Sequence, residues 1–290
     1  MTYLDRVQFA TRYDLSRYAP IELESDIVGY AHHELAEVLS DLPEVFQVTT
    51  SGLAIQPALT GYEARSEAFD RILPGLRDAG FVRSAVGEQF EVSGTLGGSP
   101  LMAVDRSAVE AFGIISSGFH LNGIVGEQMW IARRSVHKPT FPGELDNMVA
   151  GGWPRGISLA DNVVKECAEE ANIPEALART ARPVGVMTYV MEVDRGLRRH
   201  AMYLMDLDVP EDFQPQAIDG EVGSFQLMPI DEVAQVVRDS AEFKYNSAVA
   251  VINYLVRTGR ITPEEDGYVD IIRGMHSPLN VQGSACWARI

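Results

Sequence analysis

The chain has 290 residues, of which 46% are hydrophobic and 22% charged, so it can bury one large core or two modest ones. Lys and Arg number 24 against 41 Asp and Glu, a formal net charge of −17, which argues against nucleic acid as the main partner. The N-terminus has no apolar signal segment and no stretch approaches 18 apolar residues, so we expect no membrane partner and a cytoplasmic protein. Cys167 and Cys286 lie far apart and have no zinc-ligand spacing.

Residues 1–110 predict a small α/β domain whose role the residues do not reveal. It opens with a mixed leader that ends at Pro20. The predicted elements are then a helix at 32–42, two short strands within 46–57, and a helix at 66–81 that is kinked or broken near Pro74. The glycine-rich segment 94–100 lacks the spacing of a phosphate-binding loop, and we place the domain boundary between residues 98 and 112.

Residues 111–275 predict a second domain, followed by a tail at 276–290. Its expected elements, in chain order, are strands at 112–125 and 127–135, a long loop at 137–158, a helix at 158–171, strands at 184–193 and 199–209, a strand running into a helix at 224–237, and an apolar helix at 242–259. This order indicates a mixed sheet with helices packed on both faces.

The helix at 158–171 has clear start and stop signals and an unusual acidic face. Ser158 is a good N-cap, and Asn172 with Pro174 ends the helix. Glu166, Glu169 and Glu170 share one face because they are three and four residues apart. Like charges at this spacing repel, so the face is either simply solvated or holds a cation.

A divalent cation suits the acidic face and the glycines that precede it. Carboxylate oxygens are the hard ligands that Mg²⁺ and Mn²⁺ prefer. The glycines before the helix let the backbone pass close to the ion. A bound ion would relieve the repulsion, hold a diphosphate and activate a water molecule.

Residues 150–173, AGGWPRGISLADNVVKECAEEANI, resemble the Nudix box, G-x5-E-x7-R-E-U-x-E-E-x-G-U, where U is a bulky apolar residue. Gly151 takes the first glycine and Glu166, Glu169 and Glu170 take the acidic positions. The sequence departs from the box at three places: Ile157 replaces a glutamate, Lys165 an arginine, and Asn172 a glycine. Residues 219–233 and 242–264 also resemble one subfamily, related to the Nudix domain fused to thiamine pyrophosphokinase, whose members carry an N-terminal domain of about this length.

The resemblance implies a Nudix fold, a mixed β-sheet sandwiched between helices, preceded by a small α/β domain. It implies Mg²⁺-dependent hydrolysis of an organic diphosphate, with Mn²⁺ as a substitute, and points to thiamine diphosphate or its damaged oxo and oxy forms as substrates. The metal ligands would be Glu166, Glu169 and Glu170. The catalytic carboxylates would be Glu166, Glu169 and the remote Glu221, which would complete the metal site or act as the general base.

Several further residues are expected to shape the site or to touch substrate. Arg133 and Arg134 end a strand before the box, and since consecutive strand residues point to opposite faces, at most one reaches the phosphates, to which arginine binds bidentately. The other expected contacts are Gly151, Gly152, Asp146 and Asn147; turn formation is an equal alternative for the last two. Lys165 and Gly156 would support the structure of the box.

Other readings stay open at this point. A Nudix enzyme could act on ADP-ribose or another nucleotide-type substrate, or the domain could bind a ligand without catalysis. The isomerase branch that acts on isopentenyl diphosphate uses a cysteine upstream of the box, and this chain has none before Cys167. The N-terminal domain could close over the site or build a homodimer.

Overall fold

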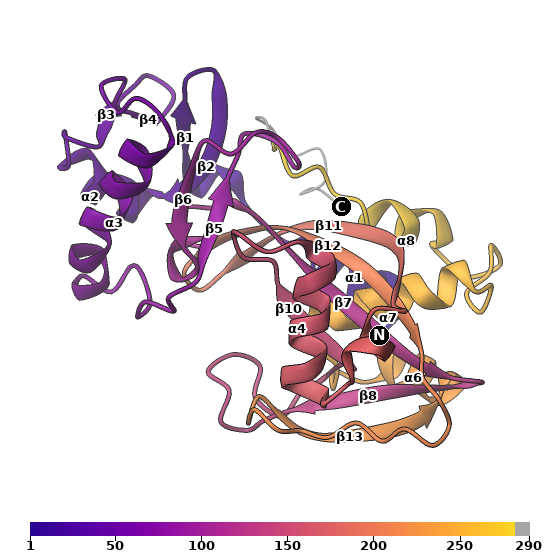
Figure 1. Cartoon of the computed structure of the whole chain (residues 1–290). Coiled ribbons are helices and arrows are strands. Elements are labelled where there is room, and N and C mark those ends of the chain that lie inside the picture. Colours follow the sequence, from indigo (N-terminus) through magenta and orange to yellow (C-terminus); the bar gives the residue numbers. More distant parts are fainter. Residues whose placement is uncertain (282–290) are drawn as a thin grey trace.

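The computed structural model describes residues 1–281. Most of the predicted tail 276–290, with Cys286, therefore lies outside the described residues. The chain forms two α/β lobes that meet along one side (Figure 1), which confirms the predicted fold class. Within the described residues, none of the helices combines the length and the apolar character that crossing a membrane requires.

The first lobe is built on a four-stranded sheet of order β2-β1-β4-β3. Its strands are β1 (Tyr18–Leu23), β2 (Asp26–His32), β3 (Phe46–Val48) and β4 (Leu53–Ile55), and its helices are α2 (His33–Ser40) and α3 (Tyr62–Asp78). A core that includes Leu39, Phe46 and Phe69 joins helices and sheet. A hairpin of β5 (Gln89–Val92) and β6 (Met102–Asp105) and the short 3-10 helix η2 (Arg106–Ala108) lead into the second lobe.

Two expectations for this lobe need correction, the break near Pro74 and the end of the leader at Pro20. Helix α3 runs unbroken through Pro74 to Asp78, although proline removes one helical hydrogen bond, because Phe69, Leu73 and Leu76 bury its apolar side. The leader before Pro20 contains helix α1 (Tyr3–Phe9), and β1 continues across Pro20. The glycine-rich segment 94–100 connects β5 to β6 within one hairpin.

The second lobe is built on a seven-stranded mixed sheet. Its main path is β11-β12-β7-β8-β13, with β10 paired to β7 and β9 to β8; β7 and β12 are parallel and the other pairs antiparallel. The strands are β7 (Ile115–Val125), β8 (Gln128–Arg134), β9 (Leu145–Asn147), β10 (Val149–Gly152), β11 (Arg182–Val193), β12 (Gly196–Asp208) and β13 (Val222–Pro229). The helices are α4 (Leu159–Ala171), α5 (Glu175–Ala178), α6 (Ile230–Asp239), α7 (Tyr245–Arg257) and α8 (Tyr268–Gly274).

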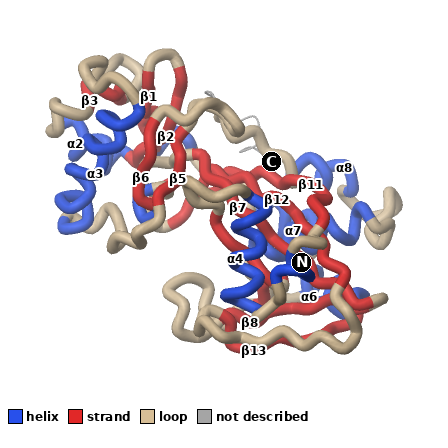
Figure 2. The backbone as a smooth tube through the Cα atoms, in the orientation of Figure 1, coloured by secondary structure: helices blue, strands red, loops and turns tan. Residues whose placement is uncertain are grey.

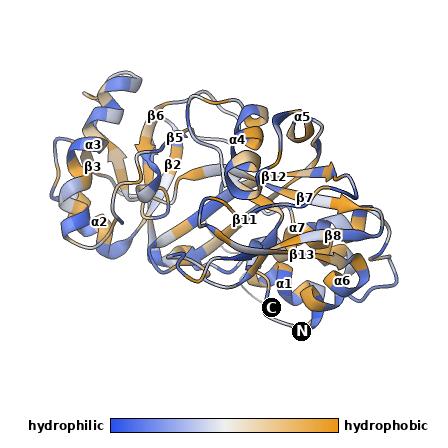
Figure 3. Cartoon of the chain, turned by 60° about the horizontal axis from the view of Figure 1, so that its bottom comes forward, coloured by the Kyte–Doolittle hydropathy of each residue, from blue (hydrophilic) through white to orange (hydrophobic). Residues whose placement is uncertain are grey.

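Helices cover both faces of this sheet, as predicted (Figure 2). On one face α4 and α5 pack against Phe119 and Leu121 of β7. On the other face α6, α7 and α8 pack against Met129 and Ile131 of β8. Figure 3 shows hydrophobic and hydrophilic residues interspersed along α4 and α6, as expected for helices with one buried side.

The predicted long loop at 137–158 is partly wrong, because it contains β9 and β10. Gly151 and Gly152 belong to β10 and pair with Phe119 and Gly118 of β7. A Cβ on Gly118 would lie 2.6 Å from the Gly151 carbonyl oxygen. Glycines at these positions therefore permit a close strand pairing, and their abundance hid the strand from the sequence pattern.

The two lobes are joined by buried polar contacts as well as by apolar packing. Arg199 of β12 is fully buried; its guanidinium donates to the carbonyl oxygens of Gly113 (3.0 Å) and Leu279 (2.8 Å) and lies over the Tyr30 ring of the first lobe. Helix α1, although first in the chain, packs against α7 and α8 of the second lobe (Figure 1). The chain therefore crosses between lobes twice.

A substitution at Gly196 tests this junction. Gly196 has φ +146, and a Cβ there would lie 2.1 Å from the Glu110 carbonyl oxygen. We expect Gly196→Ala to lower the free energy of unfolding by about 1–3 kcal/mol, the range for strained backbone positions, in urea denaturation. Gly185→Ala is the matched control, because nothing lies within 4 Å of its Cβ position. Equal stability of the two variants would contradict the close contact.

Candidate active site

Helix α4 is fixed at both ends by the residues that the sequence suggested. The Ser158 hydroxyl oxygen accepts the Asp161 backbone N–H (3.1 Å) and donates to the Asp161 carboxylate (2.7 Å). Asn172 ends the helix in the left-handed conformation, with φ 51 and ψ 37. Asparagine is the residue that best replaces glycine there, so this departure from the box preserves the backbone.

The glycine strand β10 lies directly against α4. A Cβ on Gly151 would lie 2.7 Å from the Glu166 side chain, so glycine allows the strand and helix to approach. The Asn162 amide donates to the Gly152 carbonyl (2.7 Å), and the Trp153 indole donates to the Ile157 carbonyl (2.8 Å). The first bond ties strand β10 to the helix, and the second closes the loop between them.

The three glutamates of the acidic face have different surroundings. The Lys165 ammonium donates to Glu166 (3.0 Å) and to Glu169 (2.8 Å), which offsets their mutual repulsion. The Glu169 side chain is half exposed. Glu170 is buried and its carboxylate accepts the Ala150 backbone N–H (3.1 Å). The three carboxylates that looked alike in sequence therefore differ: Glu169 is half exposed, Glu166 is largely buried with 15% of its side chain exposed, and Glu170 is buried.

Glu170 meets two acidic residues from the segment before β13. One carboxylate oxygen from each of Glu170, Asp219 and Glu221 lies within 4.8 Å of the other two. The Asp219 carboxylate accepts the Glu221 backbone N–H (2.8 Å), which shapes this segment. Burial, and then the nearby Asp146, Glu166 and Glu221 charges, raise the pKa of Glu170 to about 8 against the opposing Ala150 hydrogen bond.

This cluster fits a divalent cation by the chemistry of its donors. Glu170, Asp219 and Glu221 offer only carboxylate oxygens, the ligands preferred by Mg²⁺ and Mn²⁺. A carboxyl group whose pKa is raised by burial and by neighbouring carboxylates would ionise once a cation balanced its charge. Bound there, the ion would neutralise phosphate charge and make a water molecule more acidic.

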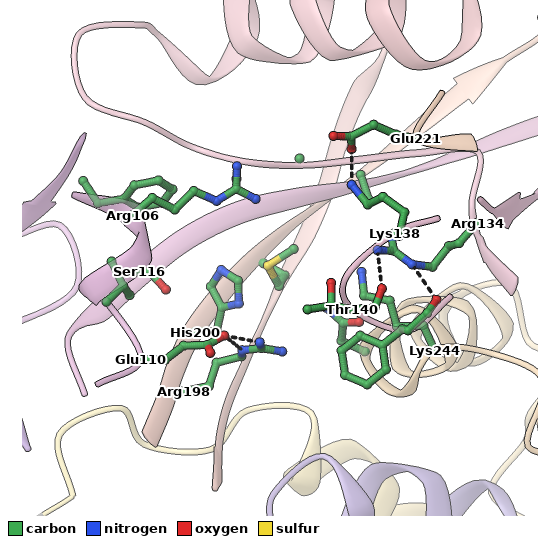
Figure 4. Close-up of a pocket in the computed structure, with 18 of the residues that line it drawn as sticks. Arg106, Glu110, Ser116, Arg134, Lys138, Thr140, Arg198, His200, Glu221 and Lys244 are labelled. Atoms are coloured by element: carbon green, nitrogen blue, oxygen red, sulfur yellow. Dashed lines mark hydrogen bonds and ion pairs between the residues drawn. The ribbon is translucent and has the colours of Figure 1, made fainter. Parts of the chain in front are cut away.

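A pocket of about 220 Å³ opens beside this cluster, between the two lobes (Figure 4). Glu170 and Glu221 lie at one side together with Ala150, Gly151 and Gly152. The remaining lining residues are Phe90, Arg106, Val109, Glu110, Ser116, Arg134, Lys138, Thr140, Phe141, Arg198, His200, Met202, Lys244 and Asn246. The pocket therefore combines carboxylates, several cations and two aromatic rings.

Asp146 organises the cations beneath the pocket. It is buried, with Arg134 at 3.0 Å, Lys244 at 3.2 Å and a hydrogen bond from the Ser247 hydroxyl. Burial alone would raise the pKa of Asp146, but Lys244, His120 and Arg134 hold it well below its usual range. Asp146 is thus a permanently charged support for Arg134 and Lys244.

The far end of the pocket, beneath the first lobe, presents neutral polar groups. His200 Nδ1 lies 3.0 Å from the Tyr189 hydroxyl, and the Asn246 amide donates to the same hydroxyl (3.3 Å). Burial and the neighbouring Arg198 hold the pKa of His200 well below its usual value, so its imidazole is neutral. Asn246 Oδ1 is buried and has no hydrogen-bond partner among the described residues.

The structure brings together some of the predicted site residues and separates others. Glu170, Glu221, Arg134, Gly151 and Gly152 border the pocket. Arg133 is exposed and binds the Gly143 carbonyl and Glu242 instead. Asn147 is buried and donates to Asn122, and Gly156 occupies a turn with φ +87.

Sequence reasoning missed Asp219 and most of the cations. Asp219 stands two residues before the predicted Glu221, and this D-x-E spacing was the available signal. Lys138, Lys244 and Arg198 lie in separate segments of the chain, and only the folded sheet brings them to one pocket. Arg106 comes from the first lobe, whose sequence carries no recognisable site motif.

The chain is similar to known domains and proteins along most of its length. Residues 120–247 match the NUDIX domain model, and residues 2–116 match DUF4743, a domain of unknown function. Nudix hydrolase 24, chloroplastic, of Arabidopsis thaliana is 37% identical over 91% of this chain and 74% of its own length. Nudix hydrolase 20, chloroplastic, of the same plant is 36% identical over the same shares. A crystal structure from Deinococcus radiodurans, 17% identical, covers 58% of this chain and 99% of its own with a TM-score of 0.43.

The chain belongs to the Nudix hydrolase family, as the box predicted, and is a Nudix-type hydrolase. One expectation needs correction. Both Arabidopsis relatives are chloroplastic by name, which overturns the prediction of a cytoplasmic protein. Composition and the lack of an apolar segment could not have distinguished these compartments.

The raised pKa of Glu170 predicts a pH-dependent stability. Between the ordinary value of 4.5 and the folded value of about 8, the folded state holds a proton that the unfolded state has lost, so metal-free stability falls as pH rises. The free energy of unfolding of Glu170→Gln minus that of wild type should therefore increase with pH. The increase between pH 4.5 and 8.5 should be on the order of 3 kcal/mol.

Urea denaturation in chelator at both pH values measures this gain. Added Mg²⁺ should stabilise wild type at pH 8.5 and have little effect on the variant. Glu175→Gln, an exposed carboxylate on α5, is the control and should show neither effect. A Glu170→Gln difference that is the same at both pH values would contradict the buried, protonated carboxyl group.

Proposed function

We propose that the protein hydrolyses the diphosphate of a small organic molecule with Mg²⁺, or with Mn²⁺ in its place. The observation that carries this proposal is the carboxylate cluster of Glu170, Asp219 and Glu221 at the edge of a pocket lined by Arg134, Lys138 and Lys244. Carboxylates would hold the ion and the basic residues would offset the charge of the phosphates.

The carboxylates would have different roles, set by their surroundings. Glu170, Asp219 and Glu221 would hold the cation; burial would raise the pKa of Glu221, but the adjacent Lys138 lowers it, so Glu221 stays ionised. Burial raises the pKa of Glu166, which outweighs the opposing Lys165 contact and favours Glu166 as the group that takes the proton of the attacking water. Glu169, held by Lys165 on the exposed side, would keep Lys165 in place.

For the organic part we propose thiamine diphosphate or its damaged oxo and oxy forms, with the monophosphate and phosphate as products. The support is the subfamily resemblance together with the pocket chemistry. Phe90 and Phe141 offer aromatic faces to a ring, which a cationic thiazolium favours. His200 and Asn246 line the pocket with neutral polar side chains, which suits a polar heterocycle such as a pyrimidine.

We also propose that the first domain ends near residue 110, with α1 counted with the second domain on which it packs. In this arrangement the first domain is the wall of the pocket opposite the carboxylates. A homodimer stays a prediction, which sedimentation equilibrium would check.

Phosphate release tests the proposed reaction. The panel is thiamine diphosphate, its oxo and oxy forms, ADP-ribose and a nucleoside triphosphate, each with Mg²⁺ and with chelator. We expect turnover of the thiamine group, lost in chelator and reduced at least 100-fold in Glu170→Gln, with Glu175→Gln unchanged. Cleavage of ADP-ribose alone would rule out the thiamine proposal, and no turnover of any compound would rule out the hydrolase proposal for this panel.

A further inference from the structure

Most cations that line the pocket already use their donor groups within the protein. Arg134 donates through Nε to the Phe141 carbonyl (3.0 Å), through Nη2 to the Thr140 carbonyl (2.9 Å), and through Nη1 to Asp146 (3.0 Å). Lys244 is paired with the same Asp146. These two side chains supply positive charge to the pocket, but Arg134 has little capacity left to grip an anion.

Two further basic side chains of the pocket are also paired within the protein. Lys138 is paired with Glu221. Arg198 is bound to Glu110 through two nitrogens and donates through the third to the Tyr245 hydroxyl. Neither can form a bidentate contact with a ligand without giving up an existing partner.

Arg106 differs from these four. Its Nη1 donates to Glu88 (2.7 Å), and its Nε and Nη2 make no hydrogen bond within residues 1–281. The side chain is 49% exposed. Figure 4 shows it extending toward the middle of the pocket, with Ser116 and His200 on one side and the Lys138–Glu221 pair across from it. Nε and Nη2 form the fork that binds two oxygens of one phosphate.

The first lobe holds Arg106 in this position. Its backbone N–H donates to the Glu88 carbonyl (2.8 Å), and the Asp105 carboxylate caps η2 by accepting the Ser107 N–H (2.9 Å). The Arg155 N–H donates to the Gln89 carbonyl (2.7 Å), which fixes the β5–β6 hairpin against the box loop. A Cβ on Gly152 would lie 3.8 Å from Arg106 Cζ, so the guanidinium lies beside the glycine strand.

We propose that Arg106 binds the diphosphate of the substrate through Nε and Nη2, so that the N-terminal domain supplies a substrate-binding residue of the active site. This inference rests on the proposed function. It gives the first domain a specific role. This domain contributes no metal ligand, but it supplies the arginine that binds the phosphates. A Nudix domain without it would bind the same compound through groups that are already paired.

Steady-state kinetics of three variants test the role of Arg106, using the compound of the panel that wild type hydrolyses. We expect Arg106→Ala to raise KM at least tenfold and Arg106→Lys to recover part of the loss, since lysine keeps the charge without the fork. Glu88→Gln removes the same ion pair but leaves Arg106, so its KM should stay within threefold of wild type. Equal KM changes and equal losses of melting temperature in Arg106→Ala and Glu88→Gln would overturn the proposal, because the pair would then be structural.

Inorganic pyrophosphate identifies the part of the substrate that Arg106 contacts. Its inhibition constant with Mg²⁺ should rise in Arg106→Ala by about the same factor as KM. An unchanged inhibition constant beside a raised KM would place Arg106 on the organic part and overturn the proposal.

Pyrophosphate also separates this proposal from the proposed function. If wild type hydrolyses no compound of the panel, the proposed function fails. The binding of pyrophosphate with Mg²⁺, measured by calorimetry, then tests the role of Arg106 by itself. A tenfold weaker affinity in Arg106→Ala, with Glu88→Gln unaffected, would support it. Equal affinities in wild type and Arg106→Ala would refute it.

Discussion

The burial of one carboxylate, Glu170, is the constraint on which the site depends. Its only hydrogen bond from the described protein is the Ala150 N–H, and its nearest charged neighbours are acidic. An arrangement of this kind costs stability unless a cation or a proton balances it. Helix α4 carries this carboxyl group, strand β10 gives it the Ala150 N–H, and the segment 219–221 brings two further carboxylates beside it.

Two groups of charged side chains border the pocket of the second lobe. Asp146 pairs with Arg134 and Lys244, and Glu170 lies beside Asp219 and Glu221. Basic side chains next to a carboxylate cluster are the combination that a diphosphate with a divalent ion requires. The first lobe closes the remaining side with Phe90, Arg106 and Glu110.

Features that depend on a local sequence pattern could be predicted from the sequence. The resemblance of residues 150–173 to the Nudix box was sufficient for the family, and the order of strands and helices was sufficient for the layered fold, which recurs in the structure. Strand β10 was missed because its glycines, needed for close approach to β7 and α4, carry no alternating pattern. Arg106, Lys138, Arg198 and Lys244 were missed because each comes from a different segment of the chain, and only the fold brings them to one pocket. The different surroundings of the three glutamates could not be predicted either. Only the structure shows that Glu166 and Glu169 are paired with Lys165, whereas Glu170 is buried.

We propose that the cation lies between Glu170 and the segment 219–221, not over the exposed side of α4. A crystal grown with Mn²⁺ and measured at the manganese absorption edge would locate the ion. We expect an anomalous peak at about 2.0–2.2 Å, the range of metal–oxygen distances for small divalent ions, from carboxylate oxygens of Glu170 and at least one of Asp219 and Glu221. A peak held by Glu166 and Glu169 alone, with Glu170 left bound only to the Ala150 N–H, would contradict it.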